Sequence, residues 1–358
     1  MNGRVAAAVN RQSGCIYSIS DSQSHLEEVA PKSCANQLQF FKDTPKDYDA
    51  WNIDPGTYDV SPSTIDNADS VEKIGTAEDP AIRVTYHTEK SKILQIISLK
   101  GDEVNISNDI DWHESHVLLK AAFPLAVNSD FATYEIPYGQ IERPTTRDNS
   151  WEKAQFEVPA MRWADLSGAG PDGKVHGLSV INKDKYGYDA VGNVLRLTLL
   201  RSPKWPDPDA DMGHQHFEYA LYPHAGTWKE ALTVRHGWEY DYPLKAVATT
   251  AHAGTLPPSH SFASVTPDNV VLTAMKKAED ANSLIFRAYE WAGKDATADF
   301  HVPSGATSAT VTNMMETPEG SPLTVEKGNA GSDIVKVPIH PYEILTIRVD
   351  YPQGGPKQ

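Results

Sequence analysis

Hydrophobic and polar positions alternate with a period of two along most of the chain, among runs of β-branched and aromatic residues. Such alternation is typical of strands that bury one face. Clusters of Gly, Pro, Asn and Asp separate the runs; Pro lacks the donor N–H of a strand, and Gly or Asn accepts a positive φ. The strands predicted in the first part of the chain are Val5–Asn10, Ile16–Asp21, Leu38–Phe41, Ala81–His87, Ile93–Lys100, Glu103–Asp111, Ser115–Phe123, Ala132–Pro137, Ala154–Val158, Trp163–Asp165, Gly177–Asn182, Val194–Leu200 and His216–Tyr222.

One segment has a helical period instead. From Thr227 to Tyr240, the residues Trp228, Leu232 and Trp238 fall near one face, and Pro243 follows the end of the segment. Apolar residues at this spacing, with a Pro beyond them, predict an amphipathic helix.

The succession of strands predicts an all-β fold, with a large antiparallel sandwich first. The composition then changes: Ala246–Ser261 is rich in Ala, Thr, Gly and Pro and has no period, which suits a linker. Short alternating strands resume from Phe262 to Tyr351 and predict a small β-sandwich. We therefore divide the chain into a large domain over 1–250, a linker over 251–261 and a small domain over 262–358.

The charge of the chain argues against nucleic acid as a partner. Its 358 residues include 48 acidic and 32 basic side chains, a net charge of −16. Phosphate recognition needs a cluster of Lys and Arg, and the basic residues here do not gather into one.

A membrane partner is not expected either. The longest apolar stretch, Leu118–Val127, is interrupted by Lys120 and Pro124 and is about half of what a bilayer requires. The first ten residues lack the apolar region and cleavage site of a secretory signal. Two cysteines, Cys15 and Cys34, allow a single bridge and leave the redox compartment open.

The segment Leu200–His224 is the richest in chemistry. Three prolines stiffen it, and it gathers polar and aromatic side chains within a short span: Arg201, Trp205, Asp207, Asp209, Asp211, His214 and His216. The acids resemble a calcium loop only poorly, because Met212 replaces the required Gly. His214 and His216 would face the same side of a strand, and a hydrogen-bonded structural pair is favoured over a metal site. A sugar-binding loop fits the composition better.

Two other polar clusters have both functional and structural interpretations. In Asp43–Tyr58, the residues Tyr48, Asp49 and Trp51 lie in a turn-prone stretch; the alternative is an ordinary surface loop with Trp51 tucked into the core. The Arg and acidic residues of Tyr138–Trp163 are interpreted as structural ion pairs.

Several enzyme signatures are absent from the sequence. It contains no Gly-x-Ser-x-Gly elbow, no P-loop, no dinucleotide glycine fingerprint and no Cys-based zinc motif. Nothing in the sequence selects one catalytic pair from its many carboxylates.

Five strings in order carry a family resemblance: NQLQFFKDTPKDYDAWNIDPG, DWHESHVLLKAAFPL, YGQIERPTTRDNSWEKAQFEVPAMRWADLS, LLRSPKWPDPDADMGHQHFEYALYPHAG, and LIFRAYEWAG with PYEILTIRV. They resemble the C-terminal part of the α-mannosidases of glycoside hydrolase family 38, closest to the cytosolic and vacuolar branch. The resemblance implies a mutarotase-like super-sandwich followed by a small β-sandwich. The resemblance to this branch favours a cytoplasmic location for the protein.

In that family, the catalytic machinery lies upstream, in an N-terminal α/β barrel and a helical bundle. The resemblance implies that the barrel carries a zinc ion and an Asp nucleophile. This chain lacks the family's His-x-Asp-x-x-Trp and has no room for a barrel of about 250 residues before its first strand. We therefore expect no catalytic residue, metal ligand or cofactor in this chain, no hydrolysis by the chain alone, and an internal cut at Met1.

The resemblance implies that two loops of the sandwich reach the substrate. From this resemblance we expect five residues to face an α-mannoside or oligomannose: Asp49, Trp51, Arg201, Asp207 and Asp209. Tyr48 and His214 are expected behind them.

The expected function is to complete the substrate cleft of an α-mannosidase and to stabilise the barrel and bundle. A free-standing carbohydrate-binding protein is the first alternative. An aldose epimerase that uses His214, His216 and Glu218 is a weaker one, since only fold analogy supports it. Association of the chain with copies of itself stays open.

Overall fold

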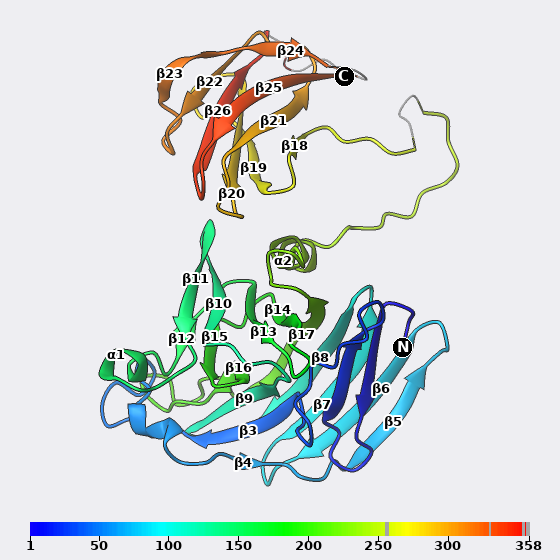
Figure 1. Cartoon of the computed structure of the whole chain (residues 1–358), viewed down its shortest axis with the longest axis vertical. Coiled ribbons are helices and arrows are strands. Elements are labelled where there is room, and N and C mark those ends of the chain that lie inside the picture. The colour runs from blue at the N-terminus through cyan, green and yellow to red at the C-terminus, as the bar shows by residue number, and fades with distance from the viewer. Residues whose placement is uncertain (255–257, 329–330, 353–354, 356–358) are drawn as a thin grey trace. The chain divides into compact units, whose positions relative to one another are not determined.

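The computed structural model describes residues 1–254, 258–328, 331–352 and 355, and it divides into two compact units, Met1–Leu244 and Lys245–Gln358. Both units are built from antiparallel strands, as Figure 1 shows. The all-β prediction is confirmed. No helix among the described residues is both long and apolar enough to cross a membrane.

The first unit is a sandwich of two large sheets with a small ribbon at its N-terminus. In the ribbon, β1 (Val5–Val9) pairs with β2 (Ile16–Asp21). The nine-stranded sheet has the order β11 (Gly139–Pro144), β10 (Phe131–Ile136), β13 (Trp163–Ala169), β14 (Val175–Asn182), β17 (Gly213–Ala225), β8 (Glu103–Trp112), β7 (Lys92–Lys100), β6 (Pro80–His87) and β5 (Ser70–Gly75). The six-stranded sheet has the order β12 (Val158–Pro159), β15 (Gly187–Val191), β16 (Val194–Arg201), β9 (Val117–Pro124), β3 (Gln37–Lys42) and β4 (Ser63–Thr64).

Alternation along the strands builds the core of this unit. On β9, Leu119, Ala121 and Phe123 enter the main apolar cluster, so Lys120 points to the opposite face of the sheet. Lys120 is nevertheless 0% exposed. The 3-10 helix η1 (Pro55–Tyr58) covers this side chain, because the ring of Tyr58 lies against the ammonium group of Lys120.

Two local predictions are wrong. The predicted helix from Thr227 begins later, as α2 (Thr233–Asp241), because Leu232 adopts φ 56° and interrupts the helical backbone before it. The predicted strand Ala154–Val158 is mostly loop: α1 (Ser150–Lys153), capped by the Asn149 side chain, precedes it, and only Val158 belongs to a strand. A cap of this kind satisfies the free N–H groups of the first turn.

The second unit is a smaller sandwich. One sheet has the order β18 (Ser264–Thr266), β21 (Ala296–Pro303), β25 (Ser332–Ile339) and β24 (Val325–Lys327). The other has the order β19 (Val270–Lys277), β20 (Ser283–Glu290), β26 (Ile344–Asp350), β22 (Ser308–Thr312) and β23 (Pro318–Leu323). Phe286, Phe300 and Ile347 are fully buried in its separate core.

Candidate functional site

Strand order brings the two predicted loops together. In the six-stranded sheet, β9 lies between β3 and β16; Lys42 at the end of β3 pairs with Val117, and Arg201 at the end of β16 pairs with Leu118. The loop after β3 and the loop after β16 therefore leave the sheet at the same edge, although about 150 residues separate them in the sequence.

Arg201 fastens the first loop to the second. Its guanidinium donates to both carboxylate oxygens of Asp43, which is 0% exposed. It also donates to the carbonyl oxygens of Ala50 (3.1 Å), Asp49 (2.8 Å) and Asn52. A bidentate Arg–carboxylate pair fixes direction as well as distance. Arg201 therefore sets the path of the chain on both sides of Trp51.

Asp49 makes the second connection between the loops. Its Oδ2 accepts from the backbone N–H groups of Lys204 (2.6 Å) and Trp205 (3.1 Å) and lies 3.2 Å from Nε2 of His116. Burial disfavours the carboxylate, but these donors outweigh burial and lower the pKa of Asp49 below its ordinary value. Asp49 is thus held as an anion that orders the turn at Trp205.

Two indoles stand out of the loops that Arg201 and Asp49 hold. Trp51 is 67% exposed and Trp205 is 59% exposed, and their rings meet edge to face with centroids 5.4 Å apart. The interpretation that buries Trp51 in the core is therefore wrong. Tyr48 is also exposed, and its carbonyl accepts from the N–H of Trp51 at 2.8 Å. An exposed pair of large aromatic rings is a feature of binding surfaces. We call Trp51 and Trp205 the indole pair.

The remaining predicted residues are less closely joined to the indole pair. Asp207 caps its own loop, because Oδ1 accepts from the N–H of Asp209 at 2.9 Å. Asp211 accepts from the N–H of Arg201 at 2.9 Å. His214 lies on β17, opposite Asp111 of β8, and so belongs to the other sheet. Its side chain and that of His216 are exposed on the same face of the strand.

A groove borders the same edge of the sheet. It has a volume of about 810 Å³ and is lined by both apolar and polar side chains. Phe40, Phe41 and Val117 line it together with Asp54 and His116. Because His116 also contacts Asp49, the groove adjoins the loops that carry the indole pair.

Sequence reasoning does not single out Asp43 or His116, although both support the loops. The sequence around Asp43 gives little sign of its role, because that role depends on Arg201, which lies far along the chain. Trp205, one of the two residues of the indole pair, is easier to recognise in the sequence. It stands between Lys204 and Pro206 in a stretch of alternating prolines.

Two family models together match most of the chain. The family model described as "Glycosyl hydrolases family 38 C-terminal domain" matches residues 1–209, which is more than half of the chain. The chain belongs to glycosyl hydrolase family 38. A second model, "Glycosyl hydrolases family 38 C-terminal beta sandwich domain", matches residues 269–347 of this family 38 chain. The resemblance seen in the sequence is therefore confirmed.

Several relatives of the family 38 chain are named α-mannosidases. It is 33% identical over 310 residues to "Alpha-mannosidase 2C1" of Mus musculus, covering 85% of this chain and 29% of that protein. It is 30% identical over 384 residues to "Alpha-mannosidase" of Saccharomyces cerevisiae, covering 97% of this chain and 34% of that protein. The chain spans about a third of the length of these relatives.

A solved structure shows the same fold. The crystal structure of an α-mannosidase from Enterococcus faecalis V583 superposes with a TM-score of 0.75 at 16% identity, covering 98% of this chain and 42% of that one. This match supports the large sandwich followed by a small sandwich.

The family 38 chain also buries an ion cluster beside the groove. Nζ of Lys120 contacts Glu157 and lies 2.5 Å from Asp189, while Arg196 lies 2.6 Å from Asp189. Tyr58 donates its hydroxyl to Glu157 at 2.7 Å. Burial and the nearby Glu157 raise the pKa of Tyr58, so it stays a donor. The cluster fixes η1, whose residues line the groove.

A Ser, a His and an Asp meet elsewhere in the first unit, but they do not form a catalytic triad. Ser179, His224 and Asp165 are all buried, beneath Thr233 of α2. Nε2 of His224 faces both Asp165 (2.8 Å) and Ser179 (3.3 Å), whereas a triad uses the two ring nitrogens separately. Burial disfavours the imidazolium, but Asp165 outweighs burial and raises the pKa of His224. The group is a packed structural network.

Glu28 and His176 form a further buried pair, with Oε2 and Nδ1 2.8 Å apart. Burial raises the pKa of Glu28 to about 7, despite the opposing effect of His176. A carboxyl whose pKa rises on folding stabilises the fold fully at low pH, and this contribution is lost as pH rises through 7.

The pH dependence of stability tests this assignment. Between pH 5 and 8, we expect the free energy of unfolding to fall by about 3 kcal/mol more in the wild type than in Glu28→Gln, which stays neutral. Urea unfolding across this range measures the difference. An equal change in the free energy of unfolding of the two proteins across this pH range would contradict the raised pKa of Glu28. Glu27→Gln, a substitution at the neighbouring, less buried Glu27, is the matched control.

Proposed function

We propose that this family 38 chain is the part of an α-mannosidase that completes the cleft for a terminal α-D-mannoside. The observation that carries the proposal is the indole pair, held out from the protein by Arg201 and Asp49. A flat aromatic face packs against the apolar face of a sugar ring, while nearby carboxylates and amides accept from sugar hydroxyls. Asp49, Trp51, Arg201, Asp207 and Asp209 are the proposed substrate-side residues, with Tyr48 and His214 behind them.

Within this group the proposed roles differ. Trp51 and Trp205 offer the contact surface, and the groove beside them offers room for further sugar units. Arg201 and Asp49 act as positioning residues, because they already have partners inside the protein. Asp207 and Asp209 stand in the exposed loop that begins at Trp205.

We propose that zinc and the nucleophile belong to an N-terminal barrel that packs, with a helical bundle, against this chain in the complete enzyme. Among residues 1–254, 258–328, 331–352 and 355, no group of three or more His, Cys, Asp or Glu side chains is placed to hold a metal ion. The described residues do not fit a zinc site, and we derive no catalytic step through zinc.

Sugar binding by the indole pair is tested by titration. Methyl α-mannoside at millimolar concentration should shift the indole N–H resonances of Trp51 and Trp205. Replacing either residue by Ala should weaken binding by roughly 5–30-fold, because each ring contributes about 1–2 kcal/mol of apolar contact. Trp151→Ala, at an indole that is 83% exposed on α1, is the matched control. An equal loss in all three variants would contradict the assignment.

Turnover is a separate test. The chain alone, with zinc added, should not hydrolyse an aryl α-mannoside, since the proposed catalytic groups lie outside it. Robust zinc-dependent release of the aryl group would overturn this proposal. Binding in the micromolar range without turnover would favour the free-standing carbohydrate-binding protein instead.

A further inference from the structure

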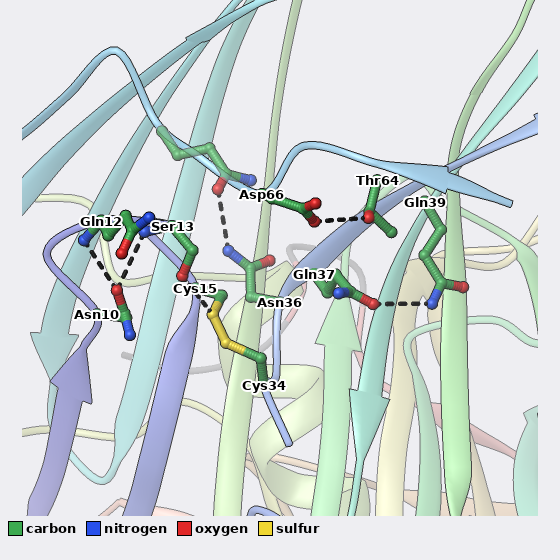
Figure 2. Close-up of a disulfide and its surroundings, with 11 residues drawn as sticks. Asn10, Gln12, Ser13, Cys15, Cys34, Asn36, Gln37, Gln39, Thr64 and Asp66 are labelled. Carbon is green, nitrogen blue, oxygen red and sulfur yellow. Dashed lines mark hydrogen bonds between the residues drawn. A yellow bond between two sulfur atoms is a disulfide. The ribbon is translucent and has the colours of Figure 1, made fainter. Parts of the chain in front are cut away.

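Cys15 and Cys34 form a disulfide that ties the N-terminal ribbon to the segment before β3. Their Cα atoms lie 5.7 Å apart, and 19 positions separate them in the sequence. Both residues line a cavity of about 190 Å³, together with Ser13, Asn36 and Asp66. Figure 2 shows the disulfide with these polar residues around it. A small polar molecule in this cavity would meet the disulfide directly.

The two cysteines have different surroundings. Cys15 is 8% exposed, whereas Cys34 is only partly buried. Oγ of Ser13 lies 2.9 Å from Sγ of Cys15. A disulfide sulfur carries no hydrogen, so the Ser13 hydroxyl is the donor in this contact. A donor in this position stabilises negative charge on Cys15 if the bond opens.

Thiol–disulfide exchange depends on these two properties. An attacking thiolate needs access to one sulfur, and the reaction is faster when the other sulfur leaves as a stabilised thiolate. Here Cys34 is the more exposed of the two residues, and Cys15 has the donor. The greater exposure of Cys34 and the donor beside Cys15 therefore both favour attack on Cys34.

We propose that Cys34 is a modification site for a low-molecular-weight thiol. The thiolate sulfur bonds to Sγ of Cys34, the Cys15–Cys34 bond breaks, and its electron pair leaves on Sγ of Cys15. The product is a mixed disulfide at Cys34 and a Cys15 thiolate, which then takes a proton from water. The exchange conserves electrons, and no other oxidant or reductant takes part.

The exchange is built to be reversible. Ile16 and Ala35, which follow the two cysteines, donate to each other's carbonyl oxygens at 2.9 and 2.8 Å. Beyond Ala35, the fully buried Asn36 accepts from Tyr219 and donates to Gln95 at 3.0 Å. These bonds keep the two segments in place when the disulfide opens. The Cys15 thiolate thus stays within reach of Cys34 and can expel the small thiol.

The site of attachment is the first test, and it is independent of sugar binding. The full chain is treated with glutathione, quenched with acid, alkylated with N-ethylmaleimide and mapped by peptide mass. We expect glutathione on Cys34 and the alkyl group on Cys15, in a ratio of about ten or more to one. A ratio near one, or glutathione mainly on Cys15, would overturn the proposal, as would two free thiols in the air-equilibrated protein.

The leaving-group role of Ser13 is the second test. Ser13→Ala should slow the opening of the disulfide by glutathione about threefold, because the Cys15 thiolate loses its donor. Ser22→Ala, at a serine of the turn after β2, should open at the wild-type rate. Equal rates for all three proteins would overturn the assigned direction of attack. Thermal unfolding of each oxidised protein shows whether the variants keep the native fold.

Trapping gives a stable product. In Cys15→Ala, glutathione disulfide should convert Cys34 fully to the mixed disulfide, since no second cysteine can displace it. In Cys34→Ala, the buried Cys15 should react about tenfold more slowly. Faster reaction of Cys15 would overturn the proposal.

Discussion

Replacing Lys120 by Met is expected to lower the free energy of unfolding of the 1–244 unit by about 3–5 kcal/mol. Lys120 is 0% exposed and shares its charge between Glu157 and Asp189, whose side chains are 16% and 2% exposed. Met fills a similar volume but removes the cation that contacts both carboxylates, and only the contact of Asp189 with Arg196 is kept from this group. Removing the cation from largely buried carboxylates is costly because little water reaches them.

The measurement is urea unfolding followed by tryptophan fluorescence, with midpoints compared at equal slope. Lys174→Met removes the cation of an exposed pair with Asp172 in the same unit and should leave the unfolding midpoint close to the wild-type value. In the double variant Lys120→Met/Glu157→Gln, the ion pair of Arg196 with Asp189 remains. It should recover about 1 kcal/mol or more of the loss. A loss below about 1 kcal/mol in the single variant would show that the cluster does not hold the fold.

Lys120 also shows what sequence reasoning can and cannot reach. The period-two pattern correctly predicts a strand around it, and Val117–Pro124 is that strand. In the sequence, however, Lys120 only interrupts an apolar run. Its partners Glu157 and Asp189 come from a loop and from β15, and no local pattern joins them. Charges buried between distant segments depend on strand order, which alternation does not give.

Backbone detail escapes the pattern for another reason. The periodicity of Trp228 and Leu232 extends a helix backward to Thr227, yet the left-handed conformation of Leu232 starts α2 at Thr233. The run Ala154–Val158 has the composition of a strand, but no neighbour pairs with its first four residues. Local propensity cannot tell whether a partner strand is present.

The candidate site is predicted in part. Sequence composition identifies both loops, and the resemblance selects Asp49, Trp51 and Arg201 within them. Only the three-dimensional structure shows that these residues have different roles: Arg201 is directed inward to Asp43, while Trp51 is directed outward with Trp205. The two loops meet because β9 lies between β3 and β16, which places both loops at one edge of the sheet.

Replacing Arg201 by Met should have an effect as large as that at Lys120. Asp43 is 0% exposed and would lose both guanidinium contacts, and three carbonyl oxygens of the first loop would lose their donor. We expect a loss of about 3–5 kcal/mol in the free energy of unfolding. Arg83→Met, at an exposed pair with Glu72, is the matched control and should cost less than about 1 kcal/mol.

Arg201→Met also separates support of the fold from support of the indole pair. The double variant Asp43→Asn/Arg201→Met removes the unpaired charge and should recover much of the stability, because the buried acid becomes neutral. It cannot restore the donors to Asp49, Ala50 and Asn52, so the loop should still lose its path beside Trp205. The edge-to-face contact of the two rings, followed by the indole resonances of Trp51 and Trp205, should then be absent in a folded protein. A double variant that regains stability and keeps the ring contact would show that Asp49 alone positions the indole pair.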